Sequence, residues 1–146
     1  MQQSPGITAV AHAIQLAVAP VFLLSGIGAM LAVLTSRLSR LIDRGRTLDA
    51  QLAASPPDAA ARIHAELAAL SRRARLIGRA ITLCTVTALL VCAVIATLFL
   101  GAFALFDTSV PVALLFVAAM VAFFAGLLFF LREIFIATAN LRIGPH

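Results

Sequence analysis

The sequence predicts an all-α integral membrane protein with three transmembrane helices and a cytoplasmic antiparallel coiled-coil hairpin between the first two. Hydrophobic residues make up 62% of the 146 residues and charged residues only 12%, whereas soluble domains carry about a quarter charged residues. Residues 7–35, 80–106 and 108–131 contain no acidic residue and no arginine. Each of these stretches exceeds the roughly 20 residues that a helix needs to cross a bilayer core. We therefore expect a single membrane domain over residues 1–146.

The three membrane spans are expected at about residues 13–35, 80–105 and 111–131. The connection between the second and third spans is short and contains Asp107, and Pro111 suits the first turn of the following helix. The second and third spans should therefore form a tight antiparallel pair.

A helical hairpin is expected between the first two spans, over residues 36–79. Apolar or small residues recur there with alternating spacings of three and four, which is typical of a coiled-coil seam. The seam consists of Leu31, Leu34, Leu38, Leu41, Gly45, Leu48 and Leu52, followed by Ile63, Leu67, Leu70, Ala74 and Ile77. A fold near Ser55 would pair Leu48 with Ile63, and Ser55 is expected to cap the second helix with Pro56 at its first position.

Arginines set the expected orientation, because the chain contains no lysine. Nine of the eleven arginines lie between residues 37 and 79, and Arg132 and Arg142 follow the third span. Loops rich in basic residues stay in the cytoplasm. The N-terminus is therefore predicted outside and the C-terminus inside the cell.

Several of these arginines crowd at the membrane end of the hairpin. They are Arg37, Arg40, Arg72, Arg73, Arg75 and Arg79. Anionic lipid headgroups are the partners expected for them, either as a specific lipid site or as the general surroundings of residues that only fix topology. Glu133 is the one acid close to the hydrocarbon boundary, and it could pair with Arg79 or with an arginine of the hairpin.

Polar residues and a proline interrupt the apolar pattern of the first span. His12, Gln15, Pro20 and Ser25 are candidates for lining a pore shared by several subunits. The alternative is that His12 and Gln15 lie at the outer interface and that the kinked helix packs inside its own subunit.

Small residues indicate close helix packing in the membrane. The candidates are Gly26, Gly28 and Ala29 on the first span, and Ala118, Ala122 and Gly126 on the third. Rows of small residues let helix backbones approach closely, which drives association in lipid. Two such faces in a chain of three spans favour a homo-oligomer.

Enzyme chemistry has no basis in this sequence. The sequence contains no Ser/His/Asp or Cys/His arrangement, no pair of carboxylates within a span and no metal-ligand spacing. The three histidines, at positions 12, 64 and 146, cannot converge on this topology. We expect no catalytic residues, no cofactor, no metal and no nucleic-acid partner.

The run AIQLAVAPVFLLSGIGAMLAVLTSRLSRLIDRGR, followed by RRARLIGRAI, resembles a bacterial family of three-span membrane proteins catalogued only as a domain of unknown function. The resemblance is strongest over residues 13–46 and 71–100. It implies a location in the bacterial inner (plasma) membrane, and it implies no activity.

Two functions remain open from the sequence. The first is a passive ion or small-solute channel of a homo-oligomer, lined by the first span. The alternative is a non-conducting scaffold or sensor that binds a cytoplasmic protein partner through its hairpin.

Overall fold

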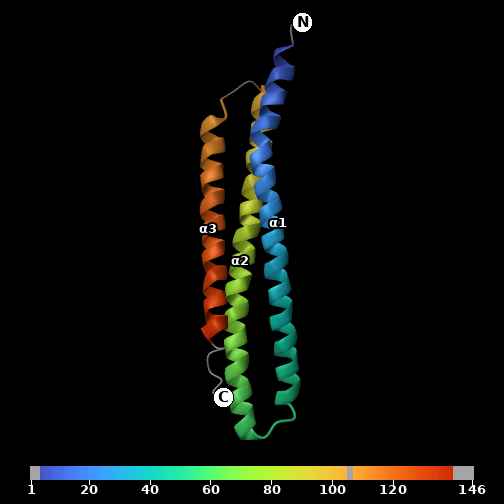
Figure 1. Ribbon diagram of the computed structural model, residues 1–146, viewed down its shortest axis with the longest axis vertical. Helices are drawn as coiled ribbons and strands as arrows, with labels where there is room; N and C mark the ends of the chain where they lie inside the picture. The colour runs from blue at the N-terminus through green and yellow to red at the C-terminus, as the bar shows by residue number, and fades with distance from the viewer. Residues whose placement is uncertain (1–3, 105–106, 140–146) are drawn as a thin grey trace. The chain divides into compact units, whose positions relative to one another are not determined.

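The computed structural model describes residues 4–104 and 107–139, and this part of the chain consists of three helices (Figure 1). They are α1 (Pro5–Leu52), α2 (Pro57–Ala104) and α3 (Ser109–Ala139). Each contains a stretch that is long and apolar enough to cross a membrane, in agreement with the expected all-helical class and the three spans. Residue 105, where the second span was expected to end, and Arg142 and His146 lie outside the described residues.

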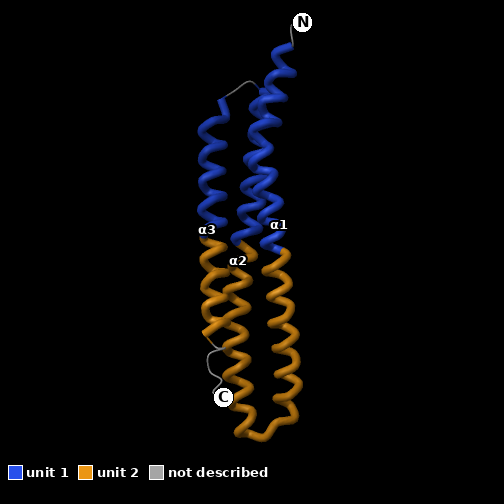
Figure 2. The backbone as a smooth tube through the Cα atoms, in the orientation of Figure 1, with its two compact units in different colours: residues 1–31, 83–124 blue, residues 32–82, 125–146 orange. Residues whose placement is uncertain are grey.

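The chain forms two compact units, and each contains a part of all three helices (Figure 2). Unit 1 comprises Met1–Leu31 and Leu83–Phe124, and unit 2 comprises Ala32–Thr82 and Ala125–His146. The predicted single domain is thus built from two contact-rich parts, and each part is described by itself below.

Unit 1 has a core of small and medium-sized side chains. Its buried residues are Ala13, Ala17, Pro20 and Ile27 of α1, Cys84, Thr87, Val91 and Val94 of α2, and Ala119 of α3. The hydroxyl of Thr87 donates a hydrogen bond to the carbonyl of Leu83 at 2.8 Å, so this buried polar group is satisfied within its own helix. The buried residues of α1 are separated by four, three and seven positions, so they lie on one narrow face of the helix that packs inward.

In unit 2, α1 and α2 run antiparallel and are joined by the turn at residues 53–56 (Figure 1). Leu34, Leu48 and Ile77 are buried, and the other seam positions named above are half-buried. Arg44 of α1 donates two hydrogen bonds to one oxygen of Glu66 of α2, at 2.8 and 3.1 Å. The repeat of apolar residues therefore identifies the less exposed face of both helices.

The cap predicted for α2 is wrong by one residue. The Ser55 hydroxyl donates backwards to the carbonyl of Gln51 at 2.7 Å, so it satisfies the end of α1 instead of the start of α2. The carbonyl of Pro56 accepts the first helical hydrogen bond, from Ala60, and the helix begins at Pro57. Pro56 and Pro57 both lack the N–H that a residue in the first turn of a helix leaves unpaired. The sequence alone therefore does not decide which of them is the first residue of α2.

The start of α3 is held by side-chain hydrogen bonds in unit 1. Asp107 accepts hydrogen bonds from the hydroxyl and, more weakly in effect, from the backbone N–H of Ser109, and these bonds lower the pKa of the Asp107 carboxyl below its usual value. Thr108 lies directly against Gly101 near the end of α2, where a Cβ would come within 2.5 Å of the Thr108 methyl group. Pro111 is in the first turn of α3, as expected.

Candidate functional site

A buried carboxylate from α3 lies between arginines of α1 and α2 in unit 2. The side chain of Glu133 is 0% exposed. Arg73 of α2 donates from Nε and Nη2 to Glu133 Oε1, at 3.1 and 2.8 Å. The Nη2 atom of Arg37 of α1 lies 3.3 Å from the other oxygen, Oε2. Of the two partners left open by the sequence, hairpin arginines are confirmed and Arg79 is not the partner.

The two oxygens of Glu133 are not equally satisfied. Oε1 accepts two hydrogen bonds, whereas Oε2 accepts none within the described residues, because Arg37 approaches at ion-pair distance without hydrogen-bond alignment. The guanidinium of Arg37 instead lies over the ring of Phe130, 5.4 Å from its centroid. Arg37 therefore divides its interactions between an anion and an aromatic face.

A pocket of about 310 Å³ adjoins this cluster. It is lined by Arg37, Arg40, Leu41, Arg73, Ile77 and Glu133. Its three arginines and one carboxylate leave a formal surplus of positive charge. Two of the arginines already contact the carboxylate, and buried charges are tolerated only when they are compensated in this way.

A second arginine pocket, of about 240 Å³, shares no residue with the first. It is lined by Arg72, Arg75, Leu76, Arg79, Arg132 and Ile136, so its basic residues come from both α2 and α3. All four arginines are exposed, and none has a carboxylate within ion-pair distance in the part of the chain that the structure describes. The guanidinium of Arg79 lies 5.9 Å from the ring centroid of Phe129.

The arginines that were grouped together from the sequence thus divide into two sets. Arg37, Arg40 and Arg73 line the pocket that contains Glu133, whereas Arg72, Arg75 and Arg79 line the pocket without an acid. Arg132 belongs to the second set and was missed as a site residue. Its position directly after the third charge-free stretch was the signal, since Arg79 directly precedes the second.

Of the four residues expected to line a pore, three are exposed and one is buried. His12, Gln15 and Ser25 are exposed, whereas Pro20 faces the core of unit 1, so the four do not form one surface. His12 and Asp107 both line a largely apolar pocket of about 610 Å³. The Ser25 hydroxyl donates to the carbonyl of Val21 at 3.4 Å.

The small residues of α1 do not pack inside the chain. Gly26, Gly28 and Ala29 are exposed, and a Cβ added to either glycine would meet nothing within 4 Å. These three positions of α1 are therefore free to contact lipid or another protein.

The small residues of α3 behave differently. Ala118 is exposed, Ala122 is half-buried and Gly126 is buried, while Ala119, which the sequence analysis did not select, is fully buried. Ala119, Ala122 and Gly126 are spaced by three and four, and Ala118, Ala122 and Gly126 by four and four, so both rows fit one side of a helix and the spacing alone does not identify the buried residue. Because Gly126 is buried, a bulky residue there would disturb the subunit itself.

The described residues contain no group of three or more metal-ligating side chains. A family model described as "Protein of unknown function (DUF2721)" matches residues 17–143. No curated protein and no solved structure matches the chain.

Proposed function

Because the chain belongs to the DUF2721 family of proteins of unknown function, we propose its function from its own residues. It is a homo-oligomeric protein of the bacterial inner membrane, with its N-terminus outside, its C-terminus in the cytoplasm and the hairpin of α1 and α2 as a cytoplasmic coiled coil. The assembly is a passive channel for ions or small solutes, and α1 lies nearest to its axis. The arginine distribution supports this orientation.

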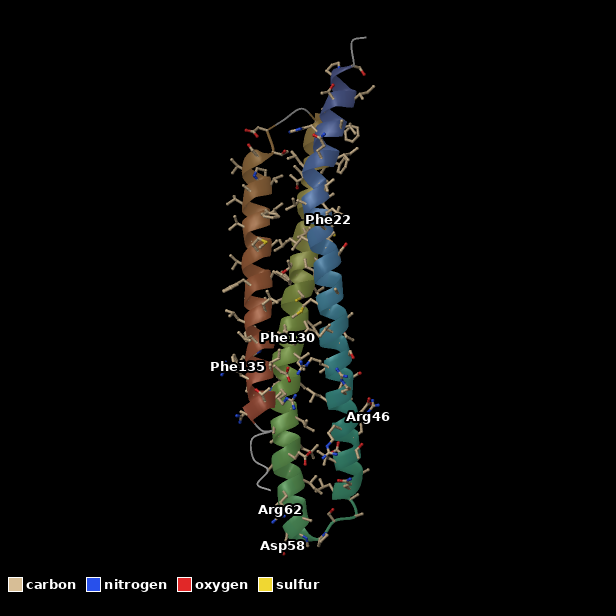
Figure 3. The ribbon with its side chains drawn as sticks, in the orientation of Figure 1. Phe22, Arg46, Asp58, Arg62, Phe130 and Phe135 are labelled. Carbon is tan, nitrogen blue, oxygen red and sulfur yellow. The ribbon has the colours of Figure 1, made fainter. Side chains whose placement is uncertain are left out.

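The exposed face of α1 in unit 1 is the observation that carries this proposal. Gln15, Phe22, Ser25 and Ala29 follow one another at spacings of seven, three and four, and all four are exposed on the side away from buried Pro20. An exposed amide is costly against lipid tails, and small residues allow close helix contact. Phe22 of α1 is 73% exposed (Figure 3). A second copy of α1 would satisfy this surface, and Gln15 and Ser25 would then border the conducting path.

The first test of this proposal is the oligomeric state. Native mass spectrometry of the detergent-solubilised protein should give the mass of an oligomer with several subunits. Ala29→Leu should shift the population towards monomer, because the larger side chain keeps the α1 helices apart. Ala118→Leu, on the exposed side of α3, makes the same change in size and should leave the mass unchanged. A monomer for the unaltered chain, or dissociation by Ala118→Leu alone, would contradict an α1 interface.

The second test is ion flux into proteoliposomes. Gln15→Leu should change the flux several-fold at unchanged oligomer mass, because it removes an amide at the mouth of the path. Ile14→Leu alters a neighbouring exposed apolar residue with little change in volume and should leave the flux unchanged. Equal flux for Gln15→Leu and the unaltered protein would rule out α1 as the lining helix.

A non-conducting scaffold or sensor is the second candidate, and the exposed charges near the turn of the hairpin favour it. Arg46 of α1 projects into the open, and Asp58 and Arg62 lie at the start of α2 (Figure 3). This surface carries both signs of charge, which suits recognition of a cytoplasmic protein with a complementary pattern. No flux from the unaltered oligomer, together with a partner lost on Arg46→Glu/Arg62→Glu, would favour this candidate over the channel.

A further inference from the structure

The pocket between α2 and α3 in unit 2 has the chemistry of an anion site. Arg72, Arg75 and Arg79 follow one another at spacings of three and four on α2, so they share one side of that helix, and Arg132 of α3 completes the group. The described residues that line it include no acidic residue. Four cations around one space repel one another unless an anion lies among them.

In the neighbouring cluster, the positive charge of the arginines is compensated by a carboxylate of the chain itself. There, Glu133 contributes a fully buried carboxylate that contacts both Arg37 and Arg73. Glu133 and Arg132 are adjacent in sequence, yet only one pocket receives the acid. Among the described residues no carboxylate reaches the second pocket, which leaves it open to an anion from outside the chain.

The position of the pocket along the helices indicates where that anion resides. Arg79 is the last charged residue before the charge-free stretch 80–106, and Arg132 is the first after the charge-free stretch 108–131. A residue at the end of a membrane span lies at the level of the lipid headgroups. Leu76 and Ile136 supply an apolar wall to the same pocket, and Phe129 lies beneath the Arg79 guanidinium.

We propose that the pocket lined by Arg72, Arg75, Arg79 and Arg132 binds the phosphate group of an anionic phospholipid. Guanidinium groups match phosphate oxygens through paired N–H donors, and basic pockets between membrane helices on the cytoplasmic side bind anionic headgroups. The apolar wall accommodates the glycerol and the first part of the acyl chains. Arg37, Arg40 and Arg73 are not part of this site, because Glu133 already supplies a carboxylate to their pocket. This inference rests on the membrane orientation proposed above, with the hairpin in the cytoplasm, and it does not depend on conduction.

The test is lipid retention by the full-length protein, measured by native mass spectrometry during titration of the detergent-solubilised protein with phosphatidylglycerol. Arg75→Gln/Arg132→Gln should weaken phosphatidylglycerol binding about 25-fold, at about fivefold for each arginine removed near a membrane surface. Arg46→Gln/Arg62→Gln removes the same charge near the hairpin turn and should leave binding unchanged. Phosphatidylcholine, titrated in the same way, should bind weakly to all three proteins.

Three results would overturn the proposal. An equal loss of phosphatidylglycerol affinity in the two glutamine double variants would show that only the overall positive charge matters, and not this pocket. Equal binding of phosphatidylglycerol and phosphatidylcholine by the unaltered protein would remove the requirement for an anion. Displacement of phosphatidylglycerol by millimolar inorganic phosphate would assign the pocket to a free anion and overturn the lipid assignment. Arg75→Lys/Arg132→Lys keeps the charge and is the variant to use if the glutamine variant does not fold. It should bind phosphatidylglycerol with intermediate affinity, because lysine lacks the paired donors.

Discussion

Arg73→Met is expected to destabilise the protein by about 3–5 kcal/mol, the cost of leaving a buried charge without its partner. Arg73 supplies both hydrogen bonds to Oε1 of Glu133, and that side chain is 0% exposed. Arg37 still offers a cation at 3.3 Å, which places the loss towards the lower end of this range. The free energy of unfolding should be measured by circular dichroism in detergent with increasing denaturant.

The control for this prediction removes both charges. Arg73→Met/Glu133→Leu should lose less stability than Arg73→Met alone, because two apolar residues leave no buried carboxylate behind. Arg44→Gln breaks the pair with Glu66, whose two side chains are 54% and 45% exposed, and it should cost at most about 1 kcal/mol. A double variant whose loss equals the sum of the two single variants would show that the Arg73–Glu133 contact contributes nothing specific.

Gly101→Ala should destabilise unit 1 by about 1–3 kcal/mol through overpacking. The added Cβ would lie 2.5 Å from the methyl group and 2.7 Å from the hydroxyl of Thr108, with the Thr108 Cβ only 3.2 Å away. Thr108 is too short and too branched to move aside by rotation alone, so the connection to α3 has to shift. The usual gain of up to about 1 kcal/mol for alanine over glycine within a helix offsets only part of this cost. The midpoint of thermal unfolding in detergent is the measurement.

A second substitution at the contact separates steric clash from other effects. Thr108→Gly removes all three neighbouring atoms. In a protein that already carries Thr108→Gly, adding Gly101→Ala should therefore cost much less stability than it does in the unaltered protein. Gly45→Ala makes the same change where a Cβ meets nothing within 4 Å, and it should be neutral or stabilising. Equal behaviour of Gly101→Ala and Gly45→Ala would contradict the close approach.

The three apolar stretches are readable from the sequence because charge and hydropathy change abruptly at residues 36, 79 and 132, and each helix continues past that change. The seam of the hairpin is readable as well, because Leu34, Leu48 and Ile77 belong to a repeat with a single period. Such a repeat fixes which side of a helix is inward, whatever the helix packs against.

The rotation of α3 is not readable in the same way. Its membrane segment is apolar on all sides, so neither Ala118 nor Ala119 is marked as inward by polarity, and only the structure shows that Ala119 is buried. The choice of partner for Glu133 depends on that rotation. Because Arg132 and Glu133 point into different pockets, the sequence could group the arginines but could not divide them.

The buried glutamate also imposes an order on the making of the protein. Arg37 and Arg73 leave the ribosome well before Glu133, which follows Arg73 by 60 residues. At about 5–20 residues per second, Arg73 waits roughly 3–12 s for its counter-charge, and Arg37, which is made earlier, waits longer. During this interval they must stay hydrated, so the third helix is the last part to arrive and the one that completes the charge balance of the other two.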